Sequence, residues 1–131
     1  MQFTFIQQSP LLITNNFCNM YYTRANIGIN FILEMFQPNA LCTVQDEELK
    51  GSYNLLINLT NQGVARYEYY NISITHQILS NNHIMINTNG VMRGVGFWQQ
   101  ITDLMRFNET FVIEYDGISW KIRNYLIKTF V

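Results

Sequence analysis

The sequence predicts an α+β protein in which the helices come first and an antiparallel sheet follows. Apolar residues recur at helical spacing up to about residue 63, and alternate with polar residues from there to the end. Short polar turns separate the alternating stretches. Helices that are segregated from an antiparallel sheet in this way are typical of the α+β class.

The first helix is expected to begin at Ser9-Pro10, because serine is a favoured N-cap and proline fits the first helical position. An apolar stripe at spacings of three and four continues this helix to about residue 24. A shorter helix is expected over residues 26–36, and Pro38 should stop it.

A short strand pair and a third helix complete the first half. The stretch "ALCTV" reads as a strand, and "QDEELKG" as an acidic hairpin tip that returns to Gly51. Ser52 is the expected cap of a third helix that ends near Gly63.

The rest of the chain predicts a four-stranded meander. The strands are expected over residues 65–79, 83–93, 106–115 and 119–130. Asp116-Gly117, between the last two strands, predicts a two-residue turn with positive φ at both positions. The last strand carries large side chains on both faces, at Tyr125, Leu126, Ile127 and Phe130, so something should cover its second face.

The bulk composition favours one domain, residues 1–131, that meets another protein. A chain of 131 residues can bury about two thirds of the surface of its unfolded form. Only 13% of the residues are charged, against about 25% in an average protein. So sparsely charged a surface suggests a protein partner. The net charge of −1 disfavours direct nucleic-acid binding.

Several other classes are not expected. No run approaches the roughly 18 apolar residues of a membrane-spanning helix, so we expect a soluble intracellular protein. Cys18 and Cys42 fall in core segments and predict free thiols. His76 and His83 lack the ligand spacing of a zinc site, and there is no phosphate-binding glycine loop or Ser-His-Asp arrangement. We therefore expect no metal and no cofactor.

Three strings and one glycine resemble the nuclear transport factor 2-like superfamily over nearly the whole chain. They are "NNFCNMYYT", Gly51, "RFNETFVIE" and "WKIRNYLIK", in this order and spacing. The resemblance implies a cone-shaped fold, in which a curved antiparallel sheet wraps around N-terminal helices and the outer sheet face pairs with a second subunit. It makes the apolar residues Tyr125 and Ile127 the dimer face.

The strings "FCNMYYT", "RFNETFVI" and "WKI" look most like the small subunit of the messenger RNA export heterodimer. In that branch a basic residue near the chain end pairs with an acid on the partner, and Lys128 falls there. The resemblance thus implies a non-enzymatic adaptor of nucleocytoplasmic transport, found in the nucleus, in the cytoplasm and at the nuclear pore. Its partners would be the large export subunit and nucleoporin repeats.

The alternative within transport is a homodimeric carrier of Ran-GDP. That branch uses an apolar cavity ringed by carboxylates, and the sequence departs from its pattern at Val44 and Gln45. Acidic side chains are nearby at Asp46 and Glu47, and Asp103 lies in the loop over residues 94–105. These acids are candidates to steer basic residues of a partner.

Phe97 and Trp98 are the remaining candidates for partner binding. Two readings are open for these rings. In the first, which we favour because exposed aromatic pairs are costly in water, they plug the open end of the cone; in the second, they anchor a partner.

An enzyme is the third alternative, because the superfamily includes ketosteroid isomerase and dehydratases. The resemblance places Tyr21 or Tyr22 near a donor tyrosine, Asp46 near a general base and Glu109 near a second acid. Against it, Asp46 belongs to an acidic hairpin tip, the tyrosines also suit a core, and Glu109 could pair with Arg106 or Arg123. We therefore expect no catalytic residues and no enzymatic activity.

Overall fold

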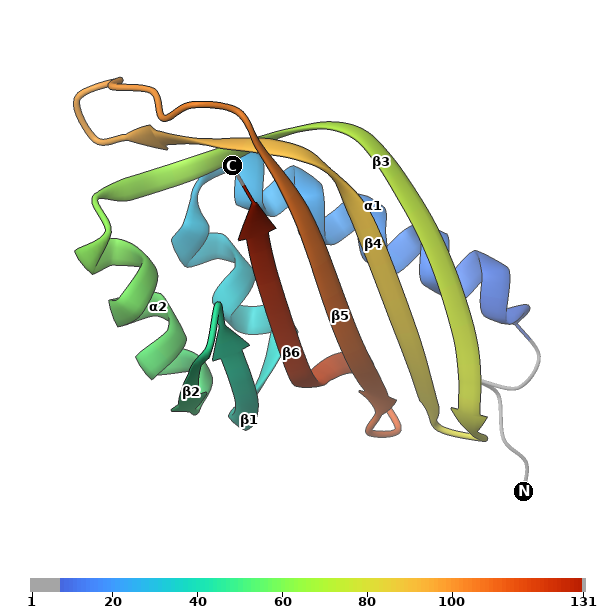
Figure 1. Ribbon diagram of the computed structural model, residues 1–131. Coiled ribbons are helices and arrows are strands. Elements are labelled where there is room, and N and C mark those ends of the chain that lie inside the picture. The colour runs from blue at the N-terminus through green and yellow to red at the C-terminus, as the bar shows by residue number, and fades with distance from the viewer. Residues whose placement is uncertain (1–7, 131) are drawn as a thin grey trace.

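A six-stranded sheet curves around three helices in the computed structural model, which describes residues 8–130 (Figure 1). The helices are α1 (Pro10–Ile27), a 3-10 helix η2 (Ile29–Met35) and α2 (Ser52–Asn61). The strands are β1 (Phe36–Val44), β2 (Glu47–Lys50), β3 (Val64–Ser80), β4 (His83–Gly96), β5 (Met105–Tyr115) and β6 (Trp120–Phe130). Their order across the sheet is β2-β1-β6-β5-β4-β3. The α+β class and the cone of curved sheet around N-terminal helices are confirmed.

The N-terminal helix follows its sequence signals. Ser9 caps α1, its hydroxyl accepting a hydrogen bond from the backbone N–H of Leu12 at 3.0 Å, and Pro10 occupies the first turn. The expected second helix is shorter and tighter than predicted, because extended backbone at Gly28 separates α1 from η2. The chain is already extended at Phe36, so Pro38 lies inside β1 and does not end the helix.

Gly51 starts α2, where the sequence had suggested Ser52. The φ angle of Gly51 is +92°, a conformation that favours glycine, and its N–H donates to the backbone carbonyl of Ala40 at 2.7 Å. Ser52 is instead the first helical residue, is buried, and makes no cap hydrogen bond.

The meander of β3, β4, β5 and β6 is antiparallel throughout, as predicted, and β1 pairs parallel with β6. The turn between β5 and β6 differs from the prediction, because it is a loop over residues 116–119 in which only Gly117 has positive φ. The Asp116 carboxylate accepts from the backbone N–H groups of Ile118 and Ser119 at 2.8 and 2.9 Å. These bonds stabilise an Asx-type turn without the strained φ values of a two-residue turn.

An irregularity in β6 decides which side chains face the core. Ile122 pairs with Ile113, but Asn124 pairs with Val112, so β6 holds one extra residue at this point. Beyond it Tyr125 points inward and is buried at 4% exposure. The prediction that Tyr125 lies on the dimer face is therefore wrong, and Ile127 is likewise partly buried against the core.

The core lies between the concave face of the sheet and the helices. Its deepest side chains come from α1 and the three central strands, among them Tyr21, Ile86, Phe111 and Ile122. Cys18 and Cys42 are buried and unbridged, as expected. Among residues 8–130, no helix has both the length and the apolar character needed to cross a membrane.

Truncating a central core residue should destabilise the fold. Ile86 has 0% of its surface exposed, so Ile86→Ala should lower the free energy of unfolding by about 2–5 kcal/mol in urea denaturation. The same change at Ile118, which is 89% exposed, is the matched control and should stay within about 0.5 kcal/mol of the original. Equal losses in both variants would contradict the placement of the core.

Candidate functional site

One carboxyl group lies at the centre of the cone. Glu109 points inward from β5 and has no exposed surface. The Tyr22 hydroxyl on α1 donates to its Oε1 at 2.7 Å, and the Tyr125 hydroxyl on β6 donates to its Oε2. Thr88 on β4 contacts the Tyr22 oxygen at 2.6 Å. Four elements thus converge on one buried acid.

Burial controls the charge of this acid. Loss of solvation raises the pKa of Glu109 to about 7, although the hydrogen bonds from Tyr125 and Tyr22 act in the opposite direction. Among the ion pairs of residues 8–130, neither Arg106 nor Arg123 pairs with it, unlike the pairing considered from the sequence. The carboxyl is therefore held by neutral hydroxyls and can exist in either protonation state near neutral pH.

Aromatic rings surround this acid and keep water away. Tyr21 stands edge-on to Phe111 with 4.8 Å between ring centroids, and Tyr22 stands edge-on to Tyr69 at 4.6 Å. Phe107 continues the wall at 5.6 Å from Tyr69. Edge-to-face packing is the favoured geometry for such rings and makes this part of the core dense.

An open groove of about 700 Å³ runs between α1 and β3, close to the buried acid. Its lining includes Asn15, Cys18, Asn19, Tyr22, Tyr69 and Ile74. Glu109 does not line the groove, whereas Tyr22 does. Tyr22 therefore separates the groove from the acid and bonds to the acid at the same time.

The structure brings together only part of the catalytic set that the resemblance implied. Tyr22 and Glu109 are hydrogen-bonded, whereas Tyr21 packs its ring on Phe111. Asp46 lies on the surface turn between β1 and β2, where Lys128 contacts its carboxylate at 3.2 Å. An exposed, ion-paired Asp46 does not face a carboxyl that is fully buried.

The other predicted partner-binding residues are on the surface, at separate places. Glu47 is exposed on β2 and accepts from the Asn58 side chain at 3.2 Å. Asp103 is exposed in the loop between β4 and β5. Phe97 and Trp98, in the same loop, are 59% and 89% exposed. The favoured reading of these two rings as a plug is therefore wrong.

Sequence reasoning missed two residues of this site, Tyr125, which donates to Glu109, and Thr88, which contacts the Tyr22 hydroxyl. Side chains alternate between the two faces of a strand, and Thr88 lies on the same face of β4 as the buried Ile84 and Ile86. Applying this alternation to the sequence would have placed Thr88 in the core. Tyr125 was assigned to the opposite face, because nothing in the sequence marks the extra residue in β6. Among residues 8–130, no cluster of three or more His, Cys, Asp or Glu could hold a metal ion.

Comparisons with known proteins give the fold and divide over function. No family model and no curated protein matches the sequence. Nuclear transport factor 2 from Cryptosporidium parvum is similar with a TM-score of 0.74 and 17% identity, covering 90% of this chain and 92% of that one. The yeast complex of the deubiquitinase Ubp3 with its cofactor Bre5 is similar with a TM-score of 0.70 and 16% identity. That match covers 95% of this chain and 99% of the other. A hexachlorocyclohexane dehydrochlorinase, LinA type 2, is similar with a TM-score of 0.73 and 12% identity. That match covers 97% of this chain and 89% of the other.

The chain therefore has the nuclear transport factor 2-like fold. The same fold occurs in transport factors, in a cofactor and in enzymes. The prediction of no enzymatic activity is wrong as an inference from this resemblance, since enzymes match the structure as well as binding proteins do.

The buried acid should make stability depend on pH between about 4.5 and 7. The Glu109 pKa rises from 4.5 to about 7 on folding, so the folded state binds more protons in this window. The contribution of Glu109 to the free energy of unfolding is therefore largest below pH 4.5. It falls by on the order of 3 kcal/mol as the pH rises to about 7. Urea titrations of the original chain and of Glu109→Gln should show this slope only in the original. The other titratable groups are common to both proteins and cancel in the difference, and parallel curves would contradict the assignment.

Proposed function

We propose that the chain is a protein-binding adaptor that works as one half of a dimer. The loop between β4 and β5 carries this proposal. It presents four large apolar side chains to solvent, at Phe97, Trp98, Ile101 and Leu104. Large exposed rings of this kind are typical anchors of protein interfaces.

The loop is held in one shape by its own hydrogen bonds. The Gly96 N–H donates to the Gln100 carbonyl at 2.8 Å, and the Trp98 N–H donates to the Gln100 side chain at 3.0 Å. The Thr102 hydroxyl accepts from the Gly94 N–H at 2.8 Å. A side chain at Gly96 would come within 2.2 Å of Gln100. A loop organised before binding loses little conformational entropy when a partner arrives.

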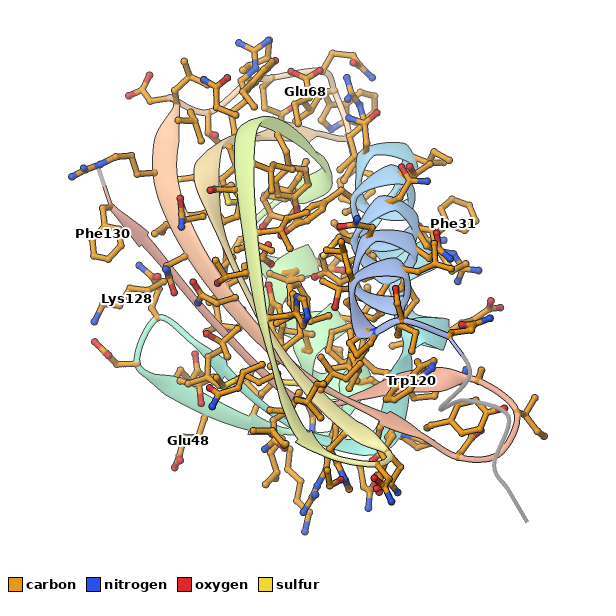
Figure 2. The ribbon with its side chains drawn as sticks, turned by 90° about the vertical axis from the view of Figure 1, so that its right-hand side faces the viewer. Phe31, Glu48, Glu68, Trp120, Lys128 and Phe130 are labelled. Atoms are coloured by element: carbon orange, nitrogen blue, oxygen red, sulfur yellow. The ribbon has the colours of Figure 1, made fainter. Side chains whose placement is uncertain are left out.

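The convex sheet face supplies a second apolar surface. Leu126, Lys128 and Phe130 point outward from β6, and Figure 2 shows Lys128 and Phe130 projecting on the side of the sheet away from α1. Across the ladder, Leu126 lies next to Thr110 and Phe130 next to Arg106. This outward set replaces Tyr125 and Ile127 as the proposed dimer face.

Within the adaptor class we propose a role in nucleocytoplasmic transport, as an export-cofactor small subunit, with a Ran-GDP carrier as the alternative. The resemblance of the sequence and the similarity to a nuclear transport factor 2 structure support transport. Lys128 is the proposed contact with an acid of the large export subunit. Its present pair with Asp46 is exposed and therefore worth little, so a partner could replace it. Presence in both nucleus and cytoplasm is part of this proposal.

Trp98→Ala and Leu126→Glu test the two surfaces. Each should weaken binding at least about tenfold to the immobilised dimerisation domain of the large export subunit or to Ran-GDP, because each removes a central apolar contact. Binding would be measured by biolayer interferometry with both baits, and the preferred bait separates the two branches.

The matched controls lie on the helix side of the molecule. Phe31 is half exposed on η2, opposite Phe130 in Figure 2, so Phe31→Ala and Phe31→Glu should leave binding unchanged. Absence of binding to either bait would remove the transport role. Binding that neither Trp98→Ala nor Leu126→Glu affects would remove these surfaces.

The hydrogen bond between Tyr22 and Glu109 favours a second candidate, a proton-transfer enzyme. A carboxyl with a pKa near 7 suits general acid–base catalysis at neutral pH. Tyr22 lines the groove, so a substrate carbonyl there could receive a hydrogen bond from its hydroxyl once that hydroxyl turns from Glu109. The absence of exposed surface on Glu109 makes this the second candidate.

Isomerisation of a β,γ-unsaturated cyclohexenone tests the enzyme candidate. If Glu109 moves the proton, conversion to the conjugated enone, followed by ultraviolet absorbance, should fall at least about 100-fold in Glu109→Gln. Glu48→Gln is the control, because Glu48 is an exposed acid on β2. An equal rate in Glu109→Gln, or no reaction in the original chain, would argue against this chemistry.

A further inference from the structure

The free edge of β3 is unusual for a natural sheet. β3 is the last strand in the sheet order, and 17 residues long (Figure 1). From Tyr69 to Asn82 the chain contains no Asp, Glu, Lys, Arg or Pro. Long edge strands without charge or proline offer their unpaired backbone groups to another strand.

The opposite edge of the same sheet has features that prevent pairing with another strand. β2 spans only Glu47–Lys50 and carries charged side chains at three of its four positions. The two edges therefore differ in length and in charge. Beyond the bulge between Tyr70 and Ser73, β3 has neither the short length nor the charge that protects β2, which makes residues 73–79 a candidate surface for strand addition.

The groove beside β3 has one wall of backbone and one wall of amides. Asn15 and Asn19 on α1 line it, and within residues 8–130 their side-chain amides have no hydrogen-bond partner. Further along the helix, the Asn26 amide already donates to the backbone carbonyl of Tyr67 on β3 at 2.9 Å. Amides of α1 are thus close enough to this strand to bind extended backbone.

The floor and the charges of the groove define what fits. Cys18, Tyr69 and Ile74 make the floor largely apolar. Its one acid, Glu68, is bound by Arg66 at 3.1 Å and by Arg93 at 2.7 Å. The lining of the groove therefore offers no unpaired carboxylate to a basic occupant and no cation to an acidic one, whereas apolar side chains would find apolar partners.

We propose that an extended, uncharged peptide segment of a partner protein binds here as a seventh strand, paired with the β3 edge and contacted by Asn15 and Asn19. Its alternate side chains are apolar and enter the groove beside Ile74. Figure 2 shows β3 in front with α1 beside it, the two walls between which the segment lies. This site is distinct from the loop and the sheet face of the adaptor proposal.

The probe is a peptide selected for binding to this protein from a display library of random peptides. The peptides are about 10 residues long, which is the length of a long strand. The most frequently recovered peptide, made synthetically with a fluorophore, is titrated with the full chain and followed by anisotropy. We expect an uncharged sequence with apolar residues at every second position. On saturation, backbone amides between Ser73 and Leu79 should exchange hydrogen at least about tenfold more slowly.

Paired variants separate this site from the rest of the surface. Ile74→Lys places a charge in the groove and should weaken the peptide at least about tenfold, while Ser73→Lys, on the other face of the strand, should not. The double variant Asn15→Ala with Asn19→Ala should weaken it, and Asn16→Ala should not. Circular dichroism confirms that each variant is folded.

Other outcomes overturn the proposal. Recovered peptides that bind the Ile74→Lys variant as tightly as the original chain would place the binding site elsewhere. So would peptides that slow hydrogen exchange in the loop over residues 97–104. Recovery of no peptide would also overturn it. A chain that is dimeric by light scattering and monomeric as Ile74→Lys would make a second copy the occupant. Because Trp98→Ala should leave peptide binding intact, failure here is separable from failure of the adaptor proposal.

Discussion

The hydrogen bonds to Glu109 are the constraint on which the interior of this protein depends. A carboxyl without solvent access is costly to bury unless donors satisfy it. Here one donor comes from α1, which lies over the concave face of the sheet, and the other from β6, the strand next to the one that carries the acid. The acid can be satisfied only when the helix and the last strand are both in place. It therefore links the position of the helix to the closure of the cone.

Much of the fold could be predicted from local sequence patterns. The features that were not predicted depend on pairing between distant strands. Ser9-Pro10 and the alternation after Gly63 led to α1 and to the meander. The extra residue in β6 reverses the face of every side chain after it, and no glycine or proline marks it. For that reason Tyr125 was placed outside the cone when it lies at its centre.

The candidate site shows the same division. Tyr22 and Glu109 were identified through the resemblance, and the structure brings them together across 87 positions of sequence. Asp46 and Lys128 were each assigned to a partner, yet they contact one another, because β1 pairs in parallel with β6 and aligns their ends. A pairing between distant strands is set by the whole sheet, so single-residue patterns do not contain it.

The distribution of charge favours apolar contact over electrostatic attraction in the binding that we propose. Charges are few, and several pair with charges of the same chain, as Glu68 does with two arginines and Asp46 with Lys128. Apolar side chains remain exposed on the loop with Trp98 and, beside the Lys128–Asp46 pair, at Leu126 and Phe130 on the outward face of β6, and the edge of β3 carries no charge from Tyr69 to Ser80. Apolar contact and backbone pairing are short-range and little screened by salt, unlike attraction between net charges. The binding that we propose would therefore depend on fit at contact, and the hydrogen bonds to the buried acid hold together the helix and the strand that shape the cone.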